Sequence, residues 1–284
     1  MLTIFGRKIR LFRPRSIWIR KLVQWLFFGL IALIAVNHTL VEAGGGIGWL
    51  SSASLHALCP FGGVETLYTF LSSGLLVKKV HDASLVLMGI GIFTAILFGP
   101  AFCGWICPLG TIQEFVSGFG RKIFRRRFNH FVPLGLDKAL RYARYAVLAW
   151  VVYATATSGV LVFEAVDPYF ALFNFWSTEV APTALAVLGV TLLLSLLVER
   201  PWCKYACPYG AFLGVFNLFS VFGIKRAAST CKADGACSIM CPMNIQVDTV
   251  KAVRDHQCIS CLECTSEAIC PVAKTVVFSS RGVK

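Results

Sequence analysis

Four long apolar segments limit what this chain can fold into more than any other feature of its sequence. They occupy residues 22–41, 83–102, 145–163 and 181–198. A helix of about 20 residues crosses a hydrocarbon core of about 30 Å, so each segment is close to the length of one span. The composition agrees, because 57% of the residues are hydrophobic and only 14% are charged. The sequence therefore predicts a mainly α-helical membrane protein built on a four-span bundle.

Basic side chains indicate how these spans are oriented. One group precedes the first span, includes no acidic residue, and comprises Arg7, Lys8, Arg10, Arg13, Arg15, Arg20 and Lys21. A second group separates the second and third spans and comprises Arg121, Lys122, Arg125, Arg126, Arg127, Lys138, Arg141 and Arg144. By the positive-inside rule, both termini and residues 103–144 are expected to be cytoplasmic. This clustering accounts for the net charge of +13 without nucleic-acid binding.

The first span follows a basic segment, residues 1–21, as the apolar part of a signal peptide would. Its apolar run is too long for a typical signal peptide, so we interpret it as an uncleaved anchor. The expected location is the cytoplasmic membrane of a prokaryote. The protein would cross it several times.

The chain has 12 cysteines, and the predicted topology places all but Cys59 on the cytoplasmic side. Disulfides are rare in that compartment because its thiols are kept reduced. Metal or cluster ligation is therefore the first interpretation of the cytoplasmic cysteines.

The membrane part reads as two similar halves, residues 22–125 and 138–222. Each half crosses outwards, returns, and ends in Cys-x3-Cys-Pro, written "CGWICP" from Cys103 and "CKYACP" from Cys203. Two halves that begin on the same side form a parallel repeat about an axis along the membrane normal. That symmetry would place both cysteine pairs at the same depth, near the cytoplasmic interface. Residues 111–124 and 211–226 follow the pairs and are predicted to be helices lying in the interface.

The two cysteine pairs together have the composition of an iron–sulfur ligand set. The i, i+4 spacing places each pair on one helical turn, and the following proline would end that turn or bend the chain. A [4Fe–4S] cluster needs four thiolates, which two pairs supply. The predicted ligands of one shared cluster are Cys103, Cys107, Cys203 and Cys207. Two alternatives stay open: a zinc ion on the same thiolates, and cysteines that are simply buried without a cofactor.

The C-terminal segment, residues 223–284, carries two cysteine runs of the two-cluster ferredoxin type. In that pattern the fourth cysteine of each run serves the other cluster. Crossing the runs gives one complete set, Cys258, Cys261, Cys264 and Cys241. The other set is Cys231, Cys237 and Cys270, with Asp234 in the position of the fourth thiolate.

Asp234 leaves the second ferredoxin cluster open to two interpretations. A carboxylate is a harder ligand than a thiolate and should hold its iron more weakly. The site could keep a [4Fe–4S] cluster with Asp234 or solvent on one iron, or lose that iron and become [3Fe–4S]. The flanking segments "GIKRAAST" and "TVVFSS" are expected to pair as edge strands, which makes this a small α+β domain.

A third Cys-Pro sequence lies in the first outer loop at Cys59. The repeat aligns it with Asp167 in the second outer loop, and it has no cysteine partner there. One interpretation is a loop corner shaped by proline, with an inert thiol. The other is an outer-face site in which Cys59, with His56 or Asp167, contacts a cofactor or a redox partner.

Two Cys-x3-Cys-Pro motifs that each end a membrane hairpin, followed by a two-cluster ferredoxin domain, resemble the NapH/NosR-type membrane ferredoxins. The resemblance covers residue 20 to the C-terminus and implies electron transfer between quinone, or an extracytoplasmic redox protein, and iron–sulfur or flavin partners. It also implies cluster ligation by the motif cysteines named above. Asp234 departs from the family pattern. The chain lacks the large extracytoplasmic flavin-binding domain of NosR-type members, so a flavin is expected on a partner.

Three functions follow from these features. The first is an electron-transfer subunit of a larger oxidoreductase, with redox partner subunits, an outer flavin- or haem-protein, and soluble ferredoxin steered by the basic cytoplasmic face. The second is a metal-reducing maturation factor. The four methionines weigh against it, because Met1, Met88, Met240 and Met243 form no ligand path. The third is a passive membrane anchor. No acid–base pair points to independent catalysis.

Overall fold

A computed structural model describes residues 2–4, 7–9, 15–42, 44–45, 82–125, 127–158, 162–176, 180–232, 234–270, 272 and 274–281. The expected outer-face residues His56 and Cys59 lie outside these ranges. The described part is mainly helical, with two small two-stranded sheets. One sheet pairs β1 (Leu2–Ile4) with β2 (Arg7–Ile9) near the N-terminus.

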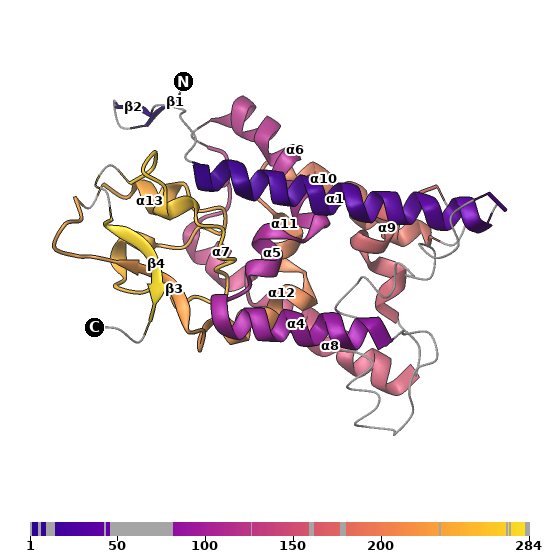
Figure 1. Cartoon of the computed structure of the whole chain (residues 1–284). Helices are drawn as coiled ribbons and strands as arrows, with labels where there is room; N and C mark the ends of the chain where they lie inside the picture. The colour runs from indigo at the N-terminus through magenta and orange to yellow at the C-terminus, as the bar shows by residue number, and fades with distance from the viewer. Residues whose placement is uncertain are drawn as a thin grey trace.

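The helices form an elongated body with the C-terminal region at one end (Figure 1). The larger helices are α1 (Arg15–Glu42), α4 (Asp82–Phe98), α6 (Pro108–Phe124), α8 (Ala143–Ser158), α10 (Pro182–Ser195) and α12 (Pro208–Asn217). Shorter helical pieces are α5 (Ala101–Trp105), α7 (Leu134–Leu140), η1 (Val162–Val166), α9 (Pro168–Asn174) and α11 (Pro201–Tyr205). The label α9 lies at the opposite end from the C-terminal region.

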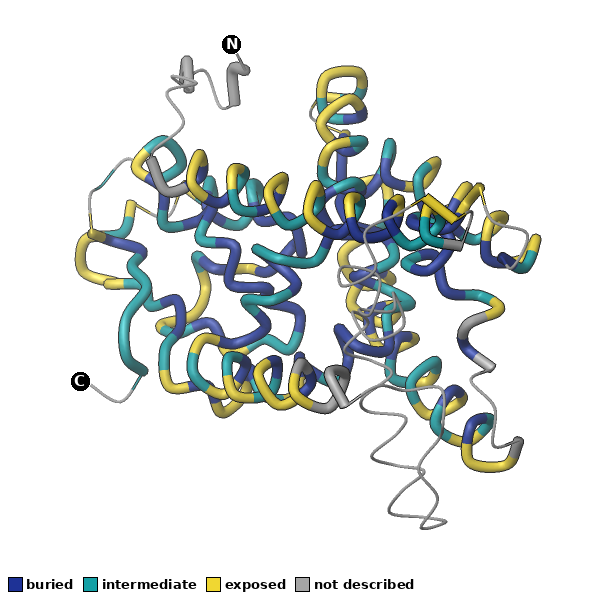
Figure 2. Tube along the Cα trace, turned by 45° about the vertical axis from the view of Figure 1, so that its right-hand side comes forward, coloured by how far each residue is buried: buried dark blue, intermediate teal, exposed yellow. Residues whose placement is uncertain are grey.

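Helix α1 is the one helix among the described residues that is long and apolar enough to span a membrane, over Ile17–Val41. Its outward face is apolar, with Leu22 66% and Leu33 59% exposed. Figure 2 shows the same arrangement along the body, where exposed turns alternate with buried ones on the outer helices. Such a surface is unusual for a protein surrounded by water and normal for one that contacts lipid or a partner.

The other three predicted spans form helices that are shorter than the apolar segments. Helix α4 has 17 residues, α8 has 16 and α10 has 14. The segment 83–102 is divided because Gly99 adopts a positive φ of 72° and Pro100 follows it. Arg200, with a φ of 51°, makes the corresponding break before Pro201. Backbone conformation, which hydropathy does not encode, therefore separates α4 from α5 at Gly99 and begins α11 after Arg200.

Both cysteine motifs have the same local structure. A five-residue helix, α5 or α11, holds the first cysteine and ends before the second. Cys107 and Cys207 are the residues that precede α6 and α12, and Pro108 and Pro208 occupy the first turn of those helices. The expectation that each pair shares one helical turn is therefore wrong. Proline is well suited to the first position of a helix, so it starts a new helix here rather than only ending the old one.

The two halves pack closely against each other. A Cβ atom at Gly120 on α6 would overlap the carbonyl oxygen of Leu196, just after α10, so only glycine allows this approach. Next to it, the hydroxyl of Ser117 donates to the carbonyl of Ser195 at 2.9 Å. Helix α4 packs against α12, where a side chain at Gly91 would meet the Tyr209 hydroxyl.

The C-terminal region is built around the strands that the sequence predicts. Strand β3 (Phe222–Arg226) pairs antiparallel with β4 (Val276–Ser280), which confirms the expected edge-strand pair. The short helical elements between the strands are α13 (Ala236–Ile239), η2 (Val247–Thr249) and η3 (Glu263–Thr265). The expected interfacial helix over 211–226 is too long, because α12 ends at Asn217. Phe98, at the end of α4, stacks on Phe222 and so joins the sheet to the helical part.

Candidate iron–sulfur sites

The first candidate site brings together the two cysteine motifs. Cys103 and Cys203 are buried, and Cys107 and Cys207 are half-buried. Burial raises the pKa of the Cys107 thiol to about 12, and the neighbouring Cys203 adds to this increase. Burial also raises the pKa of Cys207, and the three other thiols add to it. The four thiols therefore lie within electrostatic reach of one another. We call them the interfacial set.

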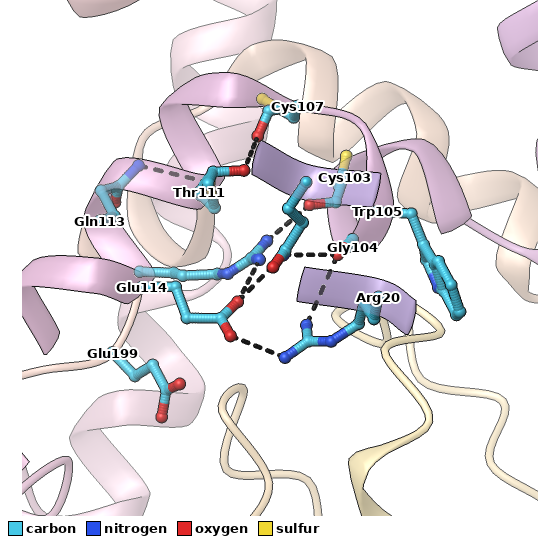
Figure 3. Close-up of polar contacts among 12 residues, drawn as sticks. Arg20, Cys103, Gly104, Trp105, Cys107, Thr111, Gln113, Glu114 and Glu199 are labelled. Atoms are coloured by element: carbon cyan, nitrogen blue, oxygen red, sulfur yellow. Dashed lines mark hydrogen bonds and ion pairs between the residues drawn. The ribbon is translucent and has the colours of Figure 1, made fainter. Parts of the chain in front are cut away.

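Hydrogen-bond donors surround the interfacial set. The side chain of Gln113 on α6 donates to Cys203 Sγ at 3.6 Å, and the backbone N–H of Gly210 donates to Cys207 Sγ at 3.3 Å. The sulfur atoms of Cys103 and Cys107 point away from the ion pair between Arg20 and Glu114 (Figure 3). Hydrogen bonds to the sulfur ligands are one of the means by which proteins tune an iron–sulfur potential.

The second candidate site is a cavity in the C-terminal region, lined by four cysteines from two separate stretches of chain. They are Cys241, Cys258, Cys261 and Cys264, and we call them the near set. The cavity, its open mouth included, holds about 320 Å³. Its remaining wall is apolar, with Ile224, Met243 and Val253 among its residues. Burial raises the pKa of the Cys241, Cys258 and Cys261 thiols to about 12 each, so these thiols need a cationic group to become thiolates.

The third candidate site is a more polar cavity of about 330 Å³. Its wall includes Cys231, Asp234, Cys237 and Cys270, which we call the far set, together with Lys232, Asp248 and Thr275. Asp234 is exposed, and its carboxylate accepts the backbone N–H of Ala236 at 3.3 Å. The structure thus places each crossed ligand set that the sequence pattern suggests around its own cavity.

The near and far donor sets are arranged around cavities. Among the described residues, no three His, Cys, Asp or Glu side chains converge in the way that one metal ion requires. The near and far sets instead line the walls of cavities, as ligands of a polynuclear cluster do. Four thiols around an apolar cavity provide the four thiolate ligands of a [4Fe–4S] cluster.

A buried ion-pair network lies beside the interfacial set and was not predicted from the sequence. Arg20 of α1 contacts Glu114 of α6 and Glu263 of η3, both at 2.7 Å. Arg200 contacts Glu114 at 2.7 Å, and Gln24 donates to the Glu114 carboxylate at 3.2 Å. Burial opposes the ionisation of Glu114, but the two guanidinium groups outweigh it and lower its pKa to about 2. Its only local trace in the sequence is the i, i+4 spacing of Arg20 and Gln24, which places both side chains on one face of α1.

A second buried ion-pair network contacts the second Cys-x3-Cys motif, Cys203 to Cys207. Lys204, between Cys203 and Cys207, pairs with Asp137 of α7 at 3.0 Å, and both side chains are fully buried. Tyr205 donates to the same carboxylate at 2.5 Å. Arg141 also pairs with Asp137 and donates to the carbonyl of Asn244 at 3.1 Å, close to Cys241. This network ties the second motif to the C-terminal region through the segment that precedes α8.

Asp167 has a structural position. It precedes α9, is only 8% exposed, and accepts the backbone N–H of Tyr169 at 2.9 Å, as an N-terminal helix cap does. Its suggested companions at an outer-face site, His56 and Cys59, lie outside the described residues, so that site stays a prediction.

Comparison with known proteins agrees with this geometry. The sequence model of a family described as a 4Fe-4S binding domain matches residues 80–127 and 180–226, the two segments that contain the Cys-x3-Cys motifs. The "Putative electron transport protein YccM" of Escherichia coli strain K12 is 32% identical over 94% of this chain and 76% of its own length. The ferredoxin-type protein NapH of Haemophilus influenzae is 30% identical over 74% of this chain and 73% of its own length. The regulatory protein NosR of Pseudomonas aeruginosa is 26% identical over 77% of this chain but only 30% of its own length. No solved structure matches.

The matched segments and the cysteine-lined sites define a 4Fe–4S ferredoxin-type protein of electron transport. The chain belongs to the family of NapH/NosR-type ferredoxin-like membrane proteins. It therefore binds 4Fe–4S clusters and acts in iron–sulfur electron transfer.

Proposed function

We propose that this protein is a membrane-integral electron-transfer subunit with three clusters, one on each cysteine set. The observation that carries the proposal is that the cysteines are grouped at three sites in the structure. Four buried or half-buried thiols from two motifs lie within electrostatic reach of one another, and each crossed ferredoxin set lines one cavity. Cysteines that were buried only for packing would not need to surround cavities.

The proposed ligands are the sets already described. The interfacial and near sets would each hold a [4Fe–4S] cluster through four thiolates. The far set has three thiolates, and its fourth position faces Asp234, so its cluster is either site-differentiated or [3Fe–4S]. The zinc alternative for the interfacial set requires four thiolates within about 2.3 Å of one ion. Iron and acid-labile sulfide measured on the purified protein distinguish the cluster from zinc.

The bilayer topology proposed here has four spans, formed by α1, α4, α8 and α10. Large apolar or aromatic side chains on all four helices face outwards: Leu30, Phe93, Tyr153 and Leu193 are 45–70% exposed. A continuous helix meets the requirement that backbone groups bond internally within lipid. Both cysteine motifs and the C-terminal region would lie at the end that carries the basic residues, which is the cytoplasmic side.

The bound clusters would supply one-electron redox chemistry. The chain's own part is to bury the sulfur ligands, exclude water from them and place cations nearby. An added electron makes a cluster more negative, so a buried guanidinium such as that of Arg200 stabilises the reduced state. The proposed route runs between quinone or an outer redox protein and cytoplasmic iron–sulfur or flavin partners. The metal-reducing maturation factor and the passive anchor are the alternatives that a test must separate from it.

The test measures iron, acid-labile sulfide and electron paramagnetic resonance (EPR) on protein purified without oxygen. About 12 irons per chain are expected from three cubane clusters, or about 11 if the far set holds [3Fe–4S]. A Cys103→Ser/Cys203→Ser variant should lose about four irons and one reducible signal, because one cluster needs all four thiolates. Cys59→Ser is the matched control, since it removes the one cysteine outside the three sets.

Iron that stays at about eight in both the wild type and the double variant would remove the interfacial cluster from the proposal. Clusters that bind but cannot be reduced at accessible potentials would instead favour the passive anchor.

A further inference from the structure

A loop of the C-terminal region lies against both cysteine motifs. This loop, residues 255–261, supplies Cys258 and Cys261 of the near set, and we call it the docking loop. At the first motif, Trp105 Nε1 donates to the carbonyl of Ser260 at 3.0 Å, and the Ser260 hydroxyl donates to the carbonyl of Phe98 at 2.7 Å. At the second motif, Gln257 donates to the carbonyl of Lys204 at 3.2 Å. Side chains that lie far apart in the sequence thus hold the loop at two points.

The closest approach occurs at Gly104. A Cβ atom there would overlap the carbonyl oxygen of Ile259 and would lie 3.4 Å from its carbonyl carbon and 3.6 Å from the Cα of Cys261. The overlapping atom belongs to the backbone, so it cannot move aside as a flexible side chain could. Gly104 therefore lets the chain between Cys103 and Cys107 touch the chain between Cys258 and Cys261. Both segments are flanked by proposed cluster ligands.

The second motif does not make this contact. Lys204 stands where the first motif has Gly104, and its side chain is turned to Asp137. Tyr205 stands where the first motif has Trp105, and it also bonds to Asp137. The two motifs share their cysteine spacing but differ at these two positions, so the first meets the docking loop through Gly104 and Trp105, whereas the second meets it through the carbonyl of Lys204.

Arg200 connects the same two sites electrostatically. It is fully buried, and its guanidinium donates to the carbonyl of Cys103 at 2.5 Å. Burial alone would lower the pKa of Arg200, but Glu114 and the thiols of Cys203 and Cys261 raise it above its ordinary value. One buried cation therefore acts on the interfacial and the near set together.

We propose that the contact of Gly104 and Trp105 with Ile259 and Ser260 is the electron-transfer junction of the molecule. This inference rests on the proposed function, because it needs clusters on the interfacial and near sets. With clusters held by the interfacial and near sets, one electron would pass from one cluster to the other, in either direction, so that one is oxidised as the other is reduced and nothing else is consumed. Gly104 and Trp105 are positioning residues: they fix the separation of the two sets and ligate neither cluster.

The junction also implies the order in which the three sites would exchange electrons. The cavity of the far set is lined by residues between Cys231 and Val276, and no residue of either motif contributes to its wall. The near set lies on the motif side, where Cys258 and Cys261 belong to the docking loop. With clusters on all three sets, electrons would therefore pass between the interfacial and far sites by way of the near site.

The experiment compares full-length protein in lipid nanodiscs with Gly104→Ala and Trp105→Phe. The first variant forces the docking loop away, and the second keeps the aromatic ring but removes the N–H donor. Gly118→Ala and Trp150→Phe are the matched controls, because Gly118 has no neighbour within 4 Å and Trp150 is 49% exposed. The readouts are iron content, the spin–spin broadening of the EPR signals in fully reduced protein, and hydrogen exchange of residues 255–261.

We expect both junction variants to keep their iron while the broadening decreases, most in Gly104→Ala. Amide protection in the docking loop should fall about tenfold in Trp105→Phe, as expected for the loss of one buried hydrogen bond. Neither control should change. Wild-type broadening and protection in both junction variants would overturn the junction and leave the proposed function intact.

Two other outcomes are also decisive. If Gly104→Ala does not fold, Trp105→Phe decides alone, since its substitution adds no atoms to the contact. If the wild-type protein holds no cluster on the interfacial set, the proposed function has failed, and the junction fails with it.

Discussion

At the scale of single residues, the positions of Cys241 and Asp234 indicate which side chains could ligate a cluster. Cys241 is distant in sequence from the run that begins at Cys258, yet it lines the same cavity as that run. Asp234 lines the far cavity at the position where the spacing leads one to expect a fourth thiolate. An exposed carboxylate is a weak substitute for a thiolate on iron, so in the proposed far cluster this single position would set how firmly one iron is held.

Asp234→Cys should complete the far set. We expect wild-type protein to develop a [3Fe–4S] EPR signal during brief exposure to air, because an iron at the Asp234 position would be held weakly. The variant should retain that iron and lose most of the signal. Glu267→Cys, an exposed position of the same region, is the control for an added thiol. An equal signal in wild type and Asp234→Cys would show that residue 234 does not supply the fourth position.

At the scale of elements, buried charges hold the helices to the C-terminal region. The network of Arg20, Glu114, Arg200 and Glu263 joins α1, α6, η3 and the residue preceding α11. Buried ion pairs give little net stability when complete, but removing one partner leaves an uncompensated charge. The network therefore favours the packing of these particular elements against one another. Removing one of its charges should lower the free energy of unfolding.

Glu114→Gln should destabilise the protein because it removes the carboxylate shared by Arg20 and Arg200. We expect a loss of about 3–5 kcal/mol in the free energy of unfolding, as measured for other broken buried pairs. The measurement is chemical or thermal unfolding in detergent, followed by circular dichroism. Glu267→Gln, an exposed carboxylate in the same protein, should change stability by no more than about 0.5 kcal/mol. Equal stability of the two variants would mean that the network contributes nothing to holding these elements together.

At the scale of the whole molecule, the sites are gathered at one end of the helical body. Strands β3 and β4 lie at that end and α9 lies at the other (Figure 1). The apolar outer surfaces of α1, α4, α8 and α10 lie between the two ends. This arrangement would place all three cysteine sets on one side of a bilayer and leave the outer loops on the opposite side.

Cysteine labelling in whole cells tests this topology. In a Cys59→Ser background, Gly45→Cys at the outer end of α1 should react with a membrane-impermeant maleimide in intact spheroplasts. Lys138→Cys should react only after the membrane is permeabilised, because positive-inside topology places α7 in the cytoplasm. Both positions are exposed. The opposite labelling pattern would reverse the orientation, and labelling of both in intact cells would contradict a spanning protein.

The sequence by itself predicted how the cysteines group into ligand sets and where one ligand departs from the pattern, and it determined which segments are apolar. It also predicted the β3–β4 pair. These features could be read because ligand spacing, strand composition and hydropathy are local properties of the chain. The breaks at Gly99 and Arg200 and the start of helices at Pro108 and Pro208 were missed, since they depend on backbone conformation as well as residue type.

Only the tertiary structure decided how the sites are held against one another. Arg20 and Glu263 are 243 positions apart, and Trp105 and Ser260 are 155 apart, so no local pattern relates them. The sequences "CGWIC" and "CKYAC" have equal ligand spacing, yet the first meets the backbone of the docking loop at Gly104, whereas the side chain at the equivalent position of the second, Lys204, pairs with Asp137. Long-range packing selects between them, because a glycine is needed where two backbones touch and a buried lysine is tolerated only where a carboxylate meets it.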